Sequence, residues 1–132
     1  VNGQSLKVGY ADANYILSLL PESKQAQTNI ASHEKMLQTQ LEAKYKDYQT
    51  KLAAYQQNAS GFDEIIRKDK ETELMALQQS IQQFEGDAQN SIVKKQSELL
   101  QPIFKKIGEA IEAVAVENNY DFIFSAGAQG VD

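Results

Sequence analysis

The sequence predicts a mostly α-helical fold with a small β body. A long antiparallel helical hairpin projects from a short-stranded sheet, and the sheets of several chains assemble into an oligomeric β-barrel. Three observations lead to this prediction. Two long polar segments carry the narrow apolar stripes of coiled-coil helices. A glycine-containing break, Ser60-Gly61, separates them. Short runs near the two ends, LKVGYAD and DFIFS, have the alternation or the aromatic and β-branched content of strands.

The chain begins with a predicted strand and a short helix. In LKVGYAD (6–12), Leu6, Val8 and Tyr10 alternate with smaller or polar residues. The next run, ANYILSLL (13–20), is short and apolar, which indicates a helix. Pro21 cannot extend that helix, but it suits the first turn of the next one.

The first long helix is predicted from about 22 to 59. Its apolar positions mostly follow a heptad, with one extra residue near Tyr45. They are Ile30, Leu37, Leu41, Tyr45, Tyr48, Leu52, Tyr55 and Ala59. Such a narrow stripe buries one seam. Gly61 then predicts a left-handed turn at the end of this helix.

A second long helix is predicted from about residue 63, so the two helices form an antiparallel hairpin. Pro102 lies inside this helix, where a proline costs about 3 kcal/mol. After Pro102 the apolar stripe widens, which indicates packing on several elements. We therefore place a bend at Pro102. The predicted arm is 22–102, and the predicted body is 1–21 with 103–132.

The hairpin returns the chain to its start, so the two predicted strands can meet in one sheet. A sheet of two or three short strands is marginal alone and leaves open edges. A symmetric oligomer in which several sheets join is the economical solution. The residues assigned to this oligomer contact are Val8, Tyr10, Phe122, Ile123 and Phe124.

Composition argues against several function classes. The net charge of −5 argues against a binder of nucleic acid or anionic membrane, because such binders need clustered Lys and Arg. There is no cysteine, and no apolar run approaches the ~20 residues of a membrane span. His33 is assigned to the solvated surface, and the pair Asp63-Glu64 to a salt-bridged helix face. No nucleophile or phosphate-loop motif is present, so we expect neither an enzyme nor a cofactor.

Two blocks of the chain, KVGYADANYILSLLPESKQAQ and LLQPIFKKIGEAIEAVAVENNYDFIFSA, with the helical hairpin between them, resemble the Skp/OmpH family of periplasmic chaperones. The resemblance spans essentially the whole chain. It implies a homotrimer with a small β-barrel body and three helical arms that enclose a cavity. It also implies ATP-independent holding of unfolded outer-membrane β-barrel proteins in the periplasm, after removal of a signal peptide.

The chain departs from this family in two ways. Family members are often strongly basic, which suits contact with lipopolysaccharide, whereas this chain is acidic. We therefore do not transfer that binding. The family also continues through another strand and a closing helix, so we expect further residues after Asp132.

Candidate client-binding residues gather on the predicted arm, near its tip. They combine aromatic, aliphatic and Met side chains, which suit a promiscuous binding surface. These residues are Tyr45, Tyr48, Tyr55, Phe62, Ile65, Ile66 and Met75. The alternative is that they pack in the seam or the tip turn.

Two other functions fit the same pattern. A prefoldin-like cytosolic chaperone also sets helical hairpins on a β body. A structural coiled-coil spacer would use the arms only to set a distance. Suppression of the aggregation of an unfolded β-barrel protein separates a chaperone from a spacer.

Overall fold

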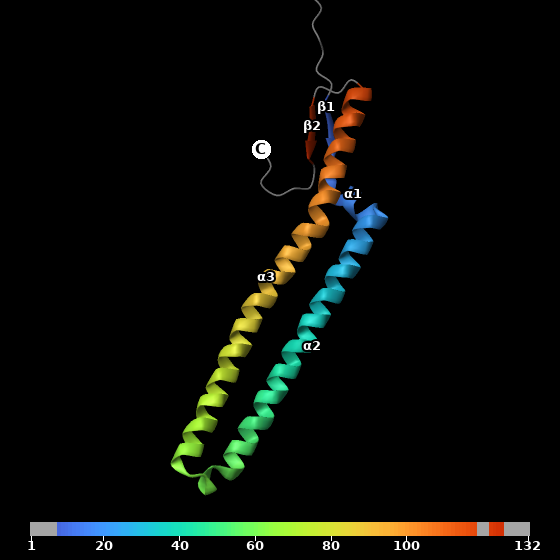
Figure 1. Cartoon of the computed structure of the whole chain (residues 1–132). Helices are drawn as coiled ribbons and strands as arrows, with labels where there is room; N and C mark the ends of the chain where they lie inside the picture. Colours follow the sequence, from blue (N-terminus) through green and yellow to red (C-terminus); the bar gives the residue numbers. More distant parts are fainter. Residues whose placement is uncertain (1–7, 119–121, 126–132) are drawn as a thin grey trace, which may run out of the picture. The chain divides into compact units, whose positions relative to one another are not determined.

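The computed structural model describes residues 8–118 and 122–125. The chain runs from a short strand through helices to a second short strand (Figure 1). In order, the elements are β1 (Val8–Ala11), α1 (Ala13–Leu19), α2 (Pro21–Asn58), the 3-10 turn η1 (Ala59–Gly61), α3 (Glu64–Glu117) and β2 (Phe122–Ser125). The predicted short helix, the two long helices and the turn between them are therefore present.

The chain divides into two compact units. One, the terminal unit, consists of residues 1–29 and 95–132. The other, the hairpin unit, consists of residues 30–94. Helix α3 continues through Pro102, which lies in the terminal unit. The division into body and arm at residues 22 and 102 stays a prediction.

In the terminal unit, Asp12 starts α1. Its backbone is extended, and its side-chain Oδ1 accepts a hydrogen bond of 3.1 Å from the backbone N–H of Tyr15. This bond satisfies one of the amide groups that a helix start leaves without a partner. Leu20 interrupts the helical backbone, and Pro21 begins α2, as the sequence predicts.

The core of the terminal unit is apolar and is formed by three helices. Its buried residues are Ala26 of α2 and Ile103 and Ile107 of α3. Half-buried side chains of α1, the α1–α2 junction and α3 pack around them: Ala13, Ile16, Leu17, Leu20, Leu99, Leu100 and Ile111. This arrangement explains why the apolar stripe of α3 widens near Pro102.

One polar group of the terminal unit is exceptional. Ser23 is 1% exposed, and its hydroxyl has no hydrogen-bond partner among the described residues. A buried hydroxyl without a partner opposes folding, because it has lost its hydrogen bonds to water.

The two strands pair with each other in parallel. Val8 is the partner of Phe122, and Tyr10 is the partner of Phe124. Parallel strands need a long crossover connection, and here the connection contains α1, α2 and α3. The two end segments therefore meet within one chain.

The predicted fold class was nevertheless wrong in its β body. Within 8–118 and 122–125, the α-helices contain 7, 38 and 54 residues, whereas each strand has four. A barrel closes only when enough strands curl into a continuous sheet, and one pair of strands makes a single ladder. The buried apolar residues of the terminal unit that the structure describes lie in helices. The described protein is helical, and it contains no β-barrel body.

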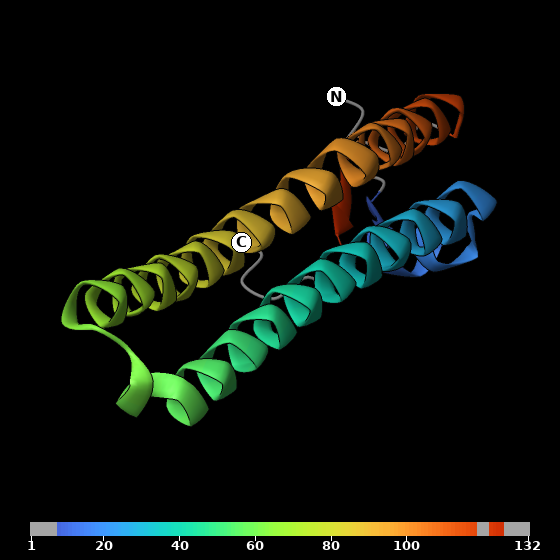
Figure 2. The same ribbon diagram turned by 60° about the horizontal axis from the view of Figure 1, so that its bottom comes forward.

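In the hairpin unit, α2 and α3 run antiparallel and side by side (Figures 1 and 2). The predicted left-handed turn at Gly61 was wrong, because this glycine lies in the 3-10 turn η1 and has no positive φ. Two other contacts fix the turn. Arg67 Nη2 donates a 2.9 Å hydrogen bond to the carbonyl oxygen of Ala59, and Asp63 Oδ1 accepts one of 2.8 Å from the N–H of Glu64.

The seam between the two helices repeats every eleven residues. The side chains of α2 that are half-buried in the hairpin unit are His33, Leu37, Leu41, Lys44, Tyr48, Leu52 and Tyr55. Lys44, and not Tyr45, therefore occupies the seam at the point where the heptad prediction needed an extra residue. Eleven residues in three turns give 3.67 per turn, close to the 3.6 of a straight helix. This spacing keeps the same face of α2 on α3 along the unit.

Candidate functional site

The hairpin unit joins its two helices through polar side chains as well as apolar ones. The hydroxyl of Tyr55 donates a 2.5 Å hydrogen bond to Glu71 Oε1, and the hydroxyl of Tyr45 donates one to Glu85. Tyr48 accepts a 2.7 Å hydrogen bond from Gln78 Nε2. All three tyrosines that we predicted to contact clients therefore bind the opposite helix with their hydroxyl groups.

Hydrogen bonds and ion pairs between side chains raise the pKa values of three groups in the hairpin unit. The hydrogen bond to Glu85 raises the pKa of Tyr45, since a carboxylate acceptor favours the neutral phenol. Glu71 raises the pKa of Tyr55 in the same way. The pKa of Lys51 is also raised, first by its bond to Glu73 and then by the charge of Asp47.

The sequence analysis did not place two polar residues, His33 and Lys44, in the seam. His33 Nε2 lies 2.8 Å from Ser91 Oγ across the seam, so the assignment of His33 to the solvated surface was wrong. Lys44 Nζ lies 5.3 Å from the centre of the Phe84 ring and 3.4 Å from Ser80 Oγ. His33, Lys44 and Tyr55 are spaced eleven residues apart. This spacing was the sequence signal that could have placed all three on the face of α2 that packs on α3.

The other predicted client-binding residues lie at or near the tip turn. Ile65 is 78% exposed, Met75 60% and Ile66 47%. Phe62 is half-buried, and its ring centre lies 6.2 Å from that of Tyr55. The start of α3 therefore carries exposed apolar side chains, while the tyrosines are held by hydrogen bonds. Client contact by all seven residues stays a prediction.

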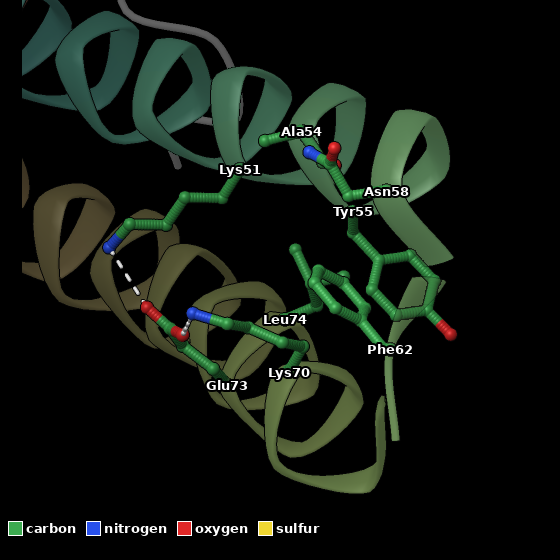
Figure 3. Close-up of a pocket in the computed structure, with 8 residues that line it drawn as sticks. All are labelled: Lys51, Ala54, Tyr55, Asn58, Phe62, Lys70, Glu73 and Leu74. Carbon is green, nitrogen blue, oxygen red and sulfur yellow. Dashed lines mark hydrogen bonds and ion pairs between the residues drawn. The ribbon is translucent and has the colours of Figure 1, made fainter. Parts of the chain in front are cut away.

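A cleft of about 320 Å³ opens between α2, the tip turn and α3 (Figure 3). Its lining combines apolar and charged side chains from both helices: Lys51, Ala54, Tyr55, Asn58, Phe62, Lys70, Glu73 and Leu74. Lys51 Nζ lies 3.2 Å from Glu73 Oε1 and 3.4 Å from Asp47 Oδ2. This cleft is the concave feature that the predicted client residues Tyr55 and Phe62 share.

The residues assigned to oligomer contacts have a partner within the chain. Val8, Tyr10, Phe122, Ile123 and Phe124 lie in β1 and β2, whose backbones pair with each other. Their role between chains stays a prediction.

The part of the chain that the structure describes offers no metal site and no membrane-spanning helix. There, His, Asp and Glu side chains form no group that could hold a metal ion. No helix there combines the length and apolar character needed to cross a bilayer. Asp63 accepts a hydrogen bond from the backbone N–H of Glu64 at the start of α3.

Fold and surface together define a class of protein: a long antiparallel helical hairpin that exposes apolar side chains beside a seam of mixed apolar and polar side chains. Comparison with known proteins makes the assignment narrower. The model of the family described as outer membrane protein (OmpH-like) matches residues 7–131, nearly the whole chain. This protein therefore belongs to the OmpH-like family. A search of curated proteins found no match.

Membership confirms the resemblance drawn from the two end blocks. The OmpH-like family is a non-enzymatic, chaperone-type family of the cell envelope, and it is known for binding outer-membrane proteins.

Proposed function

We propose that this protein is an ATP-independent holdase that binds unfolded outer-membrane β-barrel proteins and prevents their aggregation. The observation that carries the proposal is the apolar surface at the start of α3, where Ile65, Ile66 and Met75 are exposed on an OmpH-like chain. Exposed Met and branched side chains adapt to many partners. Many weak contacts to one unfolded chain add up when they act together.

The proposal includes a periplasmic location and assembly as a homotrimer. Support for assembly comes from the terminal unit, where large apolar side chains are exposed on α1 (Tyr15, Leu19) and α3 (Phe104, Val114, Val116). If a second or third copy covered these side chains, the free energy of association would become more favourable by about 25 cal/mol for each Å² of apolar surface removed from water. Sedimentation equilibrium on the chain measures the mass of the assembly directly, and a monomer at all concentrations would contradict this part.

A light-scattering assay tests holding. An outer-membrane β-barrel protein is diluted from urea with and without the chain, and aggregation is followed over time. We expect suppression by the parent chain, unchanged by ATP or a chelator. The triple variant Ile65→Ser, Ile66→Ser, Met75→Ser should lose several-fold in potency, whereas each single change should have a small effect.

A matched control separates loss of apolar surface from loss of helix. Gln56→Ser, Gln57→Ser and Gln79→Ser change three exposed polar residues of the same unit to the same amino acid. This control should hold clients as well as the parent does. A parent chain that leaves aggregation unchanged would favour the spacer and contradict the holdase.

A further inference from the structure

The tip cleft has two chemically different ends (Figure 3). One end carries the rings of Tyr55 and Phe62, beside the side chain of Leu74. The hydroxyl of Tyr55 donates a hydrogen bond to Glu71 of α3, and the ring centres of Tyr55 and Phe62 lie 6.2 Å apart. An aromatic side chain entering this end would meet rings with which it can stack edge-to-face or offset.

The other end carries two ammonium groups and one carboxylate. Lys51 is paired with both Glu73 and Asp47, at 3.2 and 3.4 Å. Lys70 Nζ lies 4.0 Å from Glu73 Oε2, which is longer than a hydrogen bond. Lys70 therefore has hydrogen-bond donors that Glu73 does not take up. Asp47 and Glu73 together balance the charges of Lys51 and Lys70, and Lys51 is paired with both carboxylates, so Lys70 is the group at this end that can bind a further carboxylate.

We propose that this cleft binds an aromatic side chain together with the carboxylate of an Asp or Glu two positions further along an extended polypeptide. In an extended chain, residues two apart point to the same side and lie roughly 6.8 Å from each other. One residue can thus reach the ring end while the other reaches Lys70. The inference rests on the proposed function and adds to it a preferred class of segment.

The charges select this occupant over an apolar segment of any kind. A purely apolar segment would bury the rings equally well but would leave the Lys70 ammonium with only its long contact to Glu73. The lysine end therefore adds selectivity, while the ring end supplies most of the contact area.

The cleft is tested by fluorescence anisotropy on the full chain with a labelled peptide, Ser-Gly-Phe-Thr-Glu-Gly-Ser. Two further peptides replace Phe by Ala or Glu by Gln. We expect the Phe/Glu peptide to bind about 3-fold more tightly than the Phe/Gln peptide, the size of one exposed ion pair. Binding of the Ala peptide should fall at least 5-fold, and added salt should narrow the Glu/Gln difference.

Two variants, each with a matched control, test whether the peptide binds in the cleft. Ala54→Leu fills the cleft and should lower the affinity for the Phe/Glu peptide at least 5-fold. Ala53→Leu changes an exposed neighbour outside the lining and should leave this affinity unchanged. Lys70→Gln should make the Glu and Gln peptides bind equally. Lys46→Gln changes the net charge by the same amount on exposed surface and should keep the difference.

The two proposals fail in different ways. The cleft inference is overturned if the parent does not prefer Glu over Gln, or if Ala54→Leu binds the peptide as tightly as the parent. A parent that still suppresses aggregation in that case keeps the proposed function. A parent that shows the expected peptide selectivity but leaves aggregation unchanged keeps the cleft as a peptide site and loses the holdase function.

Discussion

The two units of this protein bury their helices in different ways. In the terminal unit, Ile103 and Ile107 are packed among apolar side chains from three helical segments. In the hairpin unit, two helices meet along a seam where Tyr48 and Tyr55 share the contact face with leucines, and hydrogen bonds cross between the helices. One unit is held mainly by apolar burial, and the other mixes burial with surface-exposed polar bonds.

The difference has a functional meaning. Apolar burial among several helices makes a stable region, whereas exposed hydrogen bonds and ion pairs contribute little and exchange readily with water. The hairpin unit also exposes apolar side chains, among them Ile65 and Met75. A region that opens at low cost and offers apolar surface suits repeated capture and release of unfolded chains.

The largest contrast is expected from truncating one buried isoleucine in each unit. Ile107→Ala should lower the free energy of unfolding by about 2–5 kcal/mol, because its side chain is 3% exposed among three helical segments. Ile81→Ala, in the two-helix seam, should cost about half as much, since the seam can close or admit water. Urea denaturation of both variants measures this, and equal losses would contradict the contrast.

A second prediction concerns the buried hydroxyl of the terminal unit. Ser23→Ala should raise the free energy of unfolding by about 1 kcal/mol, because it removes a polar group that has no partner among the described residues. Tyr48→Phe in the hairpin unit is the counterpart, and it should destabilise slightly by freeing Gln78. Thermal unfolding of the two variants checks the signs. A loss of stability in Ser23→Ala would show that this hydroxyl has a partner.

The helices could be predicted from the sequence because their signals are local. Pro21 and the Ser60-Gly61 break mark helix ends whatever the rest of the chain does. The predicted bounds of the first long helix agree with α2, and the predicted start of the second agrees with the start of α3. The β-barrel body was wrongly predicted, since strand pairing depends on partners that are distant in sequence and the structure shows only one pair of strands among the described residues. The segment at 122–125 reads as a strand, but its four residues say nothing about how many neighbours it has.

The site was less predictable than the helices, for a related reason. A tyrosine on a seam can point its hydroxyl outward or across to the other helix, and the difference depends on which residue lies opposite. Glu71 is sixteen residues away from Tyr55, and Glu85 is forty away from Tyr45. The heptad interpretation also placed Tyr45 in the seam, where Lys44 lies. The sequence left open whether Ile65, Ile66 and Met75 pack or face solvent, and the structure shows that they are exposed.

Helix propensity offers a smaller test of the contrast. Gly86 lies in the interior of α3 with nothing near the position of an added methyl group, so Gly86→Ala should stabilise the hairpin unit by about 0.5–1 kcal/mol. Gly108→Ala is the matched change in the terminal unit, with equally open space. Amide exchange should slow mainly in the unit that carries the change. Slowing of both units by either change would mean that they unfold together.

The smallest effect is expected from alkaline pH. A raised pKa in the folded state means that protonated Tyr45 and Tyr55 stabilise the fold. This contribution is complete below about pH 10, the ordinary tyrosine pKa, and is lost as the pH rises through the folded values. Lys51 acts in the same direction. Stability measured between pH 8 and 11 should therefore fall less in the double variant Tyr45→Phe, Tyr55→Phe than in the parent. An identical fall would show that these hydroxyl groups do not contribute.

Hydrogen exchange with and without an unfolded outer-membrane β-barrel protein tests the central claim most directly. The amides of the free chain should exchange faster in residues 30–94 than in the helical parts of the terminal unit. Client should slow exchange chiefly around 54–75, where the cleft and the exposed apolar residues lie. Equal exchange in the two units of the free chain, or slowing by client that is confined to the terminal unit, would contradict the account.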